Sequence, residues 1–284
     1  MTLATLEYHK LLAYYRQEVY EVRHSGYVFN LLFFYIFIFG YIIAAVDVLL
    51  RDVDLRHVIT VLAFLLGTVY LYFSVHIQKH TAIMLREKVL EAIRAFVNTI
   101  DLKGFSFKGH SQQVYAIVCL FYEELHDYRH VLNREKLLDA AILHDIGKIN
   151  ISSEILCKQD RLTAEEWEIL KTHPLRAKEM LDVTCFKEIS DWVLYHHERA
   201  DGNGYYGLVS QDIPIEAKII AIADTYSALC SDRSYRSRLS HEEAISIISH
   251  EAGKQFDRKL VDCFLNIDKK ALEKTGAVIT ERKA

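Results

Sequence analysis

The sequence of 284 residues contains only two prolines, Pro174 and Pro214, and eleven glycines. Because these residues interrupt regular structure and form most tight turns, their scarcity favours long helices over a turn-rich β fold. An excess of charge of one sign is also lacking, since the net charge is −4 with 25% charged residues. This balance excludes the basic surface that coats nucleic acid, so we expect no nucleic acid polymer as a partner.

Paired cysteines are absent as well. The five cysteines are odd in number and widely scattered, and no two form a CxxC pair. They are Cys119, Cys157, Cys185, Cys230 and Cys263. This pattern matches neither a disulfide framework nor a zinc ribbon, and it predicts reduced thiols in a cytoplasmic domain.

Two long runs of the chain, residues 27–46 and 58–75, carry no charged residue. Twenty apolar residues in a helix span about 30 Å, the thickness of the hydrocarbon core of a bilayer. We therefore predict a transmembrane two-helix hairpin over residues 27–76, preceded by a lead of residues 1–26. A pair of buried core helices would show a polar stripe, and a cleaved signal peptide would have a shorter lead.

The distribution of lysine and arginine predicts how this hairpin is oriented. Seven such residues flank the outer ends of the two runs, against two in the connection between them. Because cytoplasmic segments carry the excess of positive charge, we expect both termini in the cytoplasm. The predicted location is an inner (cytoplasmic) membrane, with membrane lipid around the hairpin and the segment that follows it on the cytoplasmic side.

Residues 77–102 form a predicted linker helix. Val89, Ile93, Phe96 and Ile100 recur there at 4-3-4 spacing, which is typical of a coiled-coil seam. One interpretation is a homodimer formed through residues 83–100. The other is a single helix that packs on the domain that follows it.

The remaining segment, residues 103–284, reads as a soluble helical bundle, so the predicted fold class is all-α. Thr163 and Glu166 have capping-box spacing, which predicts a helix from there through Met180. The clearest loop is at 201–214, where three glycines fall close together.

Seven residues of this bundle are candidate metal ligands. They are His110, His144, Asp145, His173, His196, His197 and Asp224. Adjacent His and Asp residues can bind one metal through the imidazole and a second through a bridging carboxylate. Two ions about 3.5–4 Å apart can clamp a phosphodiester and activate a water molecule.

The strongest single indication is Asp224, which lies in the apolar segment AKIIAIADTYSAL. Burying a lone carboxylate costs several kcal/mol unless it is paired or bound to a metal. The histidines are weaker indications when they are taken singly. His173 before Pro174 also suits a helix bend, and His110 also suits a solvated helix start.

Four strings, in order, carry a resemblance to a known family. They are HDIGKINISSEIL, LTAEEWEILKTHP, HHERADGNGYYGL and IIAIADTYSALCSDRSYR, with GHSQQV upstream of them. From about residue 103 to 265 the chain resembles the HD-GYP branch of the HD phosphohydrolases. The resemblance implies an all-helical HD-type bundle that hydrolyses cyclic di-GMP and holds two or three metal ions, often iron or manganese.

The resemblance also implies roles for individual residues. The seven candidate ligands match the metal ligands of the family, with Asp145 bridging the metals. Lys148 would act in catalysis and contact the phosphate. Tyr205, Arg233 and Arg236 would bind the substrate by stacking on guanine or holding phosphate. We expect two divalent metal ions as cofactors, with iron or manganese as the favoured elements.

The chain departs from the family pattern at three positions. Tyr206 replaces the proline of the GYP signature, Ser227 replaces the second acid of ADxYDA, and Ser106 stands where trimetal members carry a glutamate. Ser106 predicts two metals and a reaction that stops at the linear dinucleotide. The altered loop leaves open a degenerate receptor that binds a cyclic dinucleotide or a partner protein without cleavage. Another cyclic dinucleotide also remains open as the substrate.

Overall fold

The computed structural model describes four stretches of the chain, residues 25–50, 55–103, 109–231 and 237–277. Within them the secondary structure is helical, and extended pairing is limited to two isolated bridges. The predicted all-α class is therefore confirmed for the described residues. The chain divides into two compact units, Met1–Glu91 and Ala92–Ala284.

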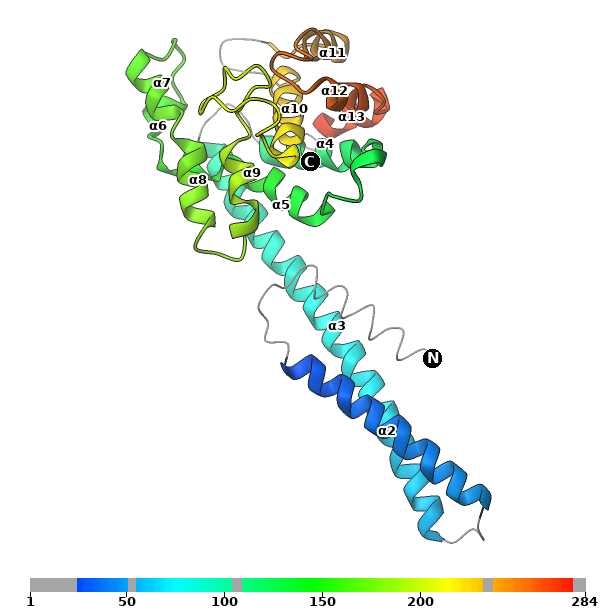
Figure 1. The fold of residues 1–284 in the computed structure, drawn as a ribbon. Helices are drawn as coiled ribbons and strands as arrows, with labels where there is room; N and C mark the ends of the chain where they lie inside the picture. Colours follow the sequence, from blue (N-terminus) through cyan, green and yellow to red (C-terminus); the bar gives the residue numbers. More distant parts are fainter. Residues whose placement is uncertain (1–24, 51–54, 104–108, 232–236, 278–284) are drawn as a thin grey trace. The chain divides into compact units, whose positions relative to one another are not determined.

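The first unit contains α2 (Ser25–Leu50) and most of α3 (Leu55–Lys103), shown in blue and cyan in Figure 1. Among the described residues, one helical segment, Leu55–Asp101, is long and apolar enough to cross a membrane. A second apolar segment in α2, Phe33–Asp47, is shorter. The two predicted spans fall in α2 and α3, and the membrane hairpin itself stays a prediction.

Reciprocal contacts between glycine and phenylalanine join the two helices of this unit. A Cβ atom at Gly40 would lie 2.2 Å from the ring of Phe64, and one at Gly67 would lie 2.2 Å from the ring of Phe37. The two rings meet edge to face, with centroids 5.7 Å apart. Small residues thus let each helix receive an aromatic ring of the other, as in close helix packing within membranes.

The predicted seam at residues 83–100 is divided between two environments. Ile93 packs against the core of the second unit, and Ile100 is buried in that core. Val89 and Phe96 remain 46% and 45% exposed. Ile93 and Ile100 therefore pack on the second unit of the same chain. The homodimer through residues 83–100 stays a prediction, which rests on the exposed Val89 and Phe96.

The second unit is built around three helices, α4 (His110–Glu124), α5 (Arg134–Leu143) and α10 (Ile215–Leu229), which pack on one another (Figure 1). The other helical elements described in this unit are η1 (His126–Tyr128), η2 (Ile146–Asn150), α6 (Ser153–Leu156), α7 (Ala164–Leu170), α8 (His173–Leu181), η3 (Lys187–Ile189), α9 (Ser190–Leu194), α11 (His241–His250), α12 (Arg258–Leu265) and α13 (Lys269–Ala277).

Aromatic residues from three helices meet at one point in the core of this unit. Phe121 of α4 and Tyr226 of α10 both contact the ring of Phe264 in α12 edge to face, with centroid distances of 5.1 and 5.5 Å. All three side chains are fully buried. Edge-to-face pairs add to the free energy of apolar burial, so this cluster holds α10 firmly against α4.

The single helix predicted from Thr163 through Met180 is wrong in its continuity, because the chain forms two helices with a break between them. Thr163 and Glu166 do form the capping box of α7, but that helix ends at Leu170 and α8 begins at His173. Pro174 lies in the first turn of α8, where its missing N–H group does no harm, whereas it could not continue α7. The break leaves the side chain of His173 buried.

Gly147 determines how closely η2 can approach α8. A Cβ atom at this position would lie 1.9 Å from the carbonyl oxygen of His173 and 2.6 Å from the backbone nitrogen of Ala177. No side chain fits in that space, so only glycine lets the two backbones touch. The contact places the turn that contains Asp145 and Lys148 beside the start of α8.

We predict that Gly147→Ala lowers the free energy of unfolding by about 1–3 kcal/mol, because the added methyl group forces η2 and α8 apart. Gly276→Ala is the matched control, since its Cβ atom would have Gln113 Nε2 at 3.4 Å as its nearest neighbour. In the helical context of α13 that change should stabilise the fold by up to about 1 kcal/mol. Urea unfolding followed by circular dichroism measures both variants, and midpoints that shift alike would contradict the prediction.

Candidate metal centre

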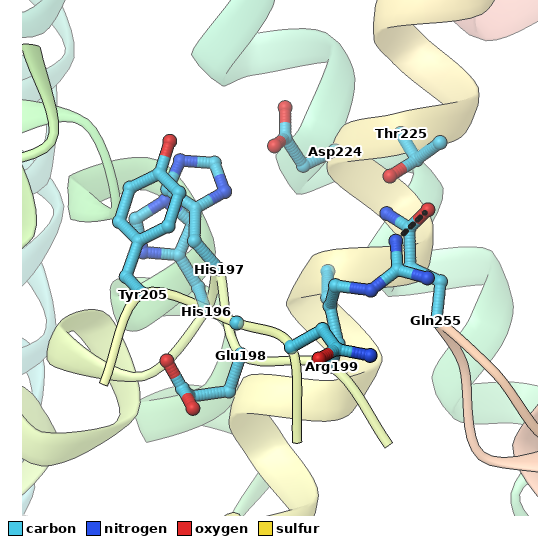
Figure 2. Close-up of a pocket in the computed structure, with 11 residues that line it drawn as sticks. His196, His197, Glu198, Arg199, Tyr205, Asp224, Thr225 and Gln255 are labelled. Atoms are coloured by element: carbon cyan, nitrogen blue, oxygen red, sulfur yellow. Dashed lines mark hydrogen bonds between the residues drawn. The ribbon is translucent and has the colours of Figure 1, made fainter. Parts of the chain in front are cut away.

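A cavity of about 200 Å³ lies beside α10 in the second unit (Figure 2). His196, His197, Tyr205 and Asp224 line it, and so do Arg199 and Gln255. The cavity thus joins imidazole and carboxylate groups to a polar wall.

Three histidines near this cavity are held by the same contact. His144, His173 and His196 each place Nδ1 against the backbone carbonyl three positions earlier, at 2.8, 2.7 and 2.6 Å. Because a carbonyl oxygen only accepts, Nδ1 carries a proton and Nε2 is the nitrogen directed at the site. The three Nε2 atoms are buried and have no hydrogen-bond partner among the described residues. Imidazoles that ligate metals are oriented in this way.

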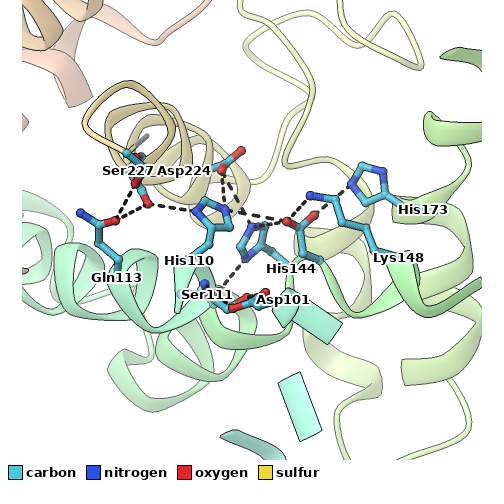
Figure 3. Close-up of polar contacts among 12 residues, drawn as sticks. Asp101, His110, Ser111, Gln113, His144, Lys148, His173, Asp224 and Ser227 are labelled. Atoms are coloured by element: carbon cyan, nitrogen blue, oxygen red, sulfur yellow. Dashed lines mark hydrogen bonds and ion pairs between the residues drawn. The ribbon is translucent and has the colours of Figure 1, made fainter. Parts of the chain in front are cut away.

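Asp145 lies close to the imidazoles of His110, His144 and His173, which Figure 3 labels. One of its oxygens, Oδ2, is 3.3 Å from His144 Nε2 and 3.8 Å from His110 Nε2, and the other, Oδ1, is 3.2 Å from His173 Nε2. A buried carboxylate this close to several imidazole nitrogens needs a positive charge beside it, either a proton or a metal ion. The donor set therefore fits metal ions, with Asp145 in a position to bridge them.

All seven predicted ligands are brought together by the fold. They form two groups, in each of which the potential ligand atoms lie within 4.8 Å of one another. The first group is Asp145, His173, His196 and His197, and the second is His110, His144 and Asp224. The side chains come from five separate segments of the chain, so the tertiary fold creates the site.

The pKa values of these groups also favour bound cations. Burial holds the pKa of His196 well below its usual range and lowers that of His197 to about 3, so both rings are neutral near pH 7. Burial by itself would lower the pKa of His144, but the carboxylates of Asp145 and Asp224 outweigh it and raise that pKa to about 9. The two carboxylates thus attract positive charge, which a metal ion would supply in place of a proton.

Lys148 lies beside the site, as predicted from its spacing. Its ammonium group contacts Asp145 Oδ2, and its side chain is 30% exposed. Burial alone would raise the pKa of Asp145, but the charges of Lys148 and His144 hold it well below its usual range. Asp145 is therefore an anion throughout the physiological pH range.

Ser227 has a role that sequence reasoning missed. Its hydroxyl group donates to Gln113 Oε1 at 2.9 Å, so its oxygen accepts from His110 Nδ1 at 3.0 Å. That contact directs His110 Nε2 toward Asp224 Oδ1, 3.0 Å away. Since Ser227 follows Asp224 by three residues, the two share a face of α10, which is the signal the sequence offered.

The predicted substrate-binding residues have different outcomes. The ring of Tyr205 lies over that of His197 with centroids 4.8 Å apart, so one of its faces is occupied within the protein. Lys171 Nζ is 5.9 Å from the centroid of the same ring. Stacking of Tyr205 on guanine stays a prediction. Arg233, Arg236 and Ser106 lie outside the described residues.

We predict that His144→Ala and Asp145→Ala each remove bound metal while the helical fold is retained, because these residues join the two ligand groups. The matched control is His126→Ala, since His126 is exposed and belongs to neither group. Elemental analysis gives the metal content of the purified chain, and circular dichroism gives its helicity. Full metal retention in both site variants would contradict the assignment.

Residues 94–260 match a family model described as HD domain. A probable cyclic di-GMP phosphodiesterase of Vibrio cholerae is 34% identical over 194 residues, which cover 64% of this chain and 44% of that protein. The cyclic di-GMP phosphodiesterase response regulator RpfG of Xanthomonas campestris is 40% identical over 44% of this chain and 34% of its own length. A further relative, 3'3'-cGAMP-specific phosphodiesterase 2 of Vibrio cholerae, is 32% identical over 64% of this chain and 35% of its own length.

This chain therefore spans less than half the length of these curated relatives. The family model nevertheless covers more than half of the chain, including all seven candidate ligands. Together with the ordered motifs and the two groups of histidines and aspartates, this match shows that the chain belongs to the HD-domain family, in its HD-GYP branch.

Proposed function

We propose that the chain is a metal-dependent phosphodiesterase that hydrolyses cyclic di-GMP. The observation that carries the proposal is the convergence of seven imidazole and carboxylate side chains into two groups that meet at Asp145. Adjacent cations suit phosphodiester cleavage because they can stabilise both the attacking and the leaving oxygen. The printed names of the relatives support the same class of reaction.

Two divalent ions, iron or manganese, are the proposed cofactors. Imidazole nitrogen combined with carboxylate oxygen suits such ions better than a thiolate zinc site. The group around His173 would hold one ion and the group around His110 the other, with Asp145 shared. When bound, the ions would supply Lewis acidity toward the phosphodiester and lower the pKa of an attacking water molecule.

The protein's own side chains would orient the substrate and neutralise charge. Asp145 keeps its two oxygens directed at separate imidazole groups, which fixes the spacing of the site. Lys148, partly exposed beside it, can place its ammonium group on a phosphate and stabilise the negative charge that develops there. Arg233 and Arg236 are proposed to hold phosphate or guanine, since their planar guanidinium groups suit both.

The proposed product is the linear dinucleotide pGpG. Ser106 is neutral and short where trimetal members of the family carry a glutamate, and a serine hydroxyl is a weak ligand for a divalent cation. The linear product carries an additional terminal phosphate, whose charge a third cation would help to neutralise. With two ions, the second cleavage should be much slower than the first.

Two alternatives rest on specific observations. Tyr206 in place of the family's proline favours a receptor that binds the nucleotide or a partner protein without cleaving it. Relatives named as 3'3'-cGAMP-specific phosphodiesterases favour a different cyclic dinucleotide as the substrate. Metal content separates the receptor from the enzyme, because a receptor has no need of two bound ions.

The proposed location is the inner membrane of a bacterium, with both termini and the catalytic domain in the cytoplasm. The apolar helices α2 and α3 and the distribution of lysine and arginine support this placement. A homodimer through residues 83–100 is also proposed, because Val89 and Phe96 leave apolar surface exposed on α3.

We predict that the metal-loaded chain converts cyclic di-GMP to pGpG, with GMP appearing much more slowly. Chromatography of timed samples measures both products, and 3'3'-cGAMP is tested in parallel. The Asp145→Ala variant should be inactive, and Glu243→Gln, a capping residue of α11, should keep full activity. GMP formed as fast as pGpG would refute the two-metal argument, and tight binding without turnover would favour the receptor.

We also predict the topology of the hairpin. Reporter fusions placed after residues 26, 54 and 80 should report inside, outside and inside, because both apolar runs are expected to cross the membrane. A fusion after residue 26 that reports outside would reverse the orientation. A fusion after residue 54 that reports inside would mean that the chain does not cross the membrane twice.

A further inference from the structure

Glu198 is a buried carboxylate that points away from the metal centre. It follows His196 and His197 directly in the sequence, yet Figure 2 shows its carboxylate directed away from both imidazoles. The residue is 4% exposed. Its two oxygens accept the backbone N–H groups of Tyr206 and Leu208, each at 2.6 Å. Charge-assisted bonds of this length in a buried setting are among the stronger hydrogen bonds of proteins.

These two bonds hold a loop that crosses directly over Glu198. A Cβ atom at Gly204 would lie 2.6 Å from the Cα atom of Glu198 and 2.8 Å from the backbone nitrogen of Arg199. Only glycine permits that approach. Gly207 has a φ of +79°, so the loop turns just before Leu208. The glycines let the backbone reach the carboxylate, and the carboxylate then fixes its path.

The start of the same loop is anchored by different contacts. The N–H groups of Ala200 and Asp201 donate to the carbonyl oxygens of Gln255 and Lys254, at 3.1 and 2.8 Å. The guanidinium group of Arg199 bonds both carboxylate oxygens of Asp201, at 3.1 and 3.0 Å. The first residues of the loop are thus tied to the segment before α12, whereas the part that carries Tyr205 relies on Glu198.

Residue 206 decides whether the first of these bonds can form. Proline, which the family signature has at this position, carries no N–H group and could not donate to Glu198. Tyr206 donates, and its ring also packs edge to face on Tyr195 at 5.9 Å. Its neighbour Tyr205 lies over His197 and forms a wall of the cavity.

We propose that Glu198 is a positioning residue, which holds Tyr205 against His197 by accepting the N–H groups of Tyr206 and Leu208. In this chain the hydrogen bond to Tyr206 replaces the rigidity that a proline ring would give to the loop. The substitution in the signature is therefore compensated within the loop. The consequence for substrate binding rests on the proposed hydrolysis, whereas the consequence for loop order does not.

The test compares Glu198→Gln in two backgrounds of the full chain, with Tyr or Pro at position 206. An amide can accept only one of the two N–H groups and presents its NH₂ to the other, so the Tyr206 background should lose loop order. Hydrogen exchange of the peptide that covers residues 203–209 should accelerate about tenfold or more there, as expected when a buried charged group loses a hydrogen bond. In the Tyr206→Pro background the NH₂ meets no donor, and the same change should accelerate exchange less than about threefold.

The steady-state kinetics of cyclic di-GMP hydrolysis provide a second test of the role of Glu198. Glu198→Gln should raise KM about tenfold and leave kcat within about threefold, because it loosens a wall of the cavity and leaves the metal ligands in place. Glu243→Gln is the matched control, since Glu243 also accepts a backbone N–H group, that of Ser240, at 2.8 Å. Metal content should be unchanged in all variants.

Several results would overturn the proposal. Exchange and KM of Glu198→Gln within about twofold of the control would do so, and so would equal acceleration in both backgrounds. Should Glu198→Gln lose its helical circular dichroism, Glu198→Asp keeps the charge but shortens the reach, and unaltered exchange in that variant would refute the role. If the unmodified chain does not hydrolyse cyclic di-GMP, the proposed hydrolysis fails and the exchange data alone decide on Glu198.

Discussion

The candidate metal centre depends on how the carbonyl groups at helix ends are satisfied. The last carbonyls of a helix have no partner within it, and a buried helix end needs donors from elsewhere. His144, His173 and His196 supply them, because each donates Nδ1–H to a carbonyl of the helix that ends one to three residues before it. The same bond that completes a helix also turns Nε2 toward the cavity. The same hydrogen bond from Nδ1–H to a backbone carbonyl therefore both ends the helix and orients the imidazole.

This arrangement explains why the helices around the site are short. α5, α7 and α9 have 10, 7 and 5 residues, and each ends at or close to a ligand. If α7 continued past Leu170, His173 would lie within that helix. The carbonyl oxygen of Leu170 would then accept a backbone N–H group of the helix in place of His173 Nδ1–H. Pro174 prevents that extension, and Gly147 then lets η2 contact the start of α8. Pro174 and Gly147, neither of which is a candidate ligand, thus determine how the candidate ligands are placed.

The sequence pointed to the residues that converge in the candidate site more clearly than to the scaffold that orients them. Ordered motifs and a carboxylate in an apolar helix are local signals. They were therefore enough to identify all seven residues that the fold brings together. The break between α7 and α8 was missed, since the capping box marks only where a helix begins. The roles of Ser227 and Glu198 were also missed, because their partners lie 114 and 8 to 10 residues away and the contacts exist only in the folded chain. The spacing of apolar residues along the sequence indicates which residues are buried. It carries no information on hydrogen bonds between separate segments of the chain.

The last turn of α3 completes the start of α4, where the candidate ligand His110 lies. Gly109 precedes that helix in a left-handed conformation, with φ 82° and ψ 18°, and offers no side chain to cap it. Asp101 provides the cap, since its carboxylate accepts the backbone N–H and the hydroxyl group of Ser111, at 3.2 and 3.0 Å. Asn98, one turn earlier, accepts from Gln112 at 2.8 Å. The helix that carries the apolar segment is thus also the helix that caps α4. A movement of its last turn would uncap α4 one residue away from a candidate ligand of the metal centre.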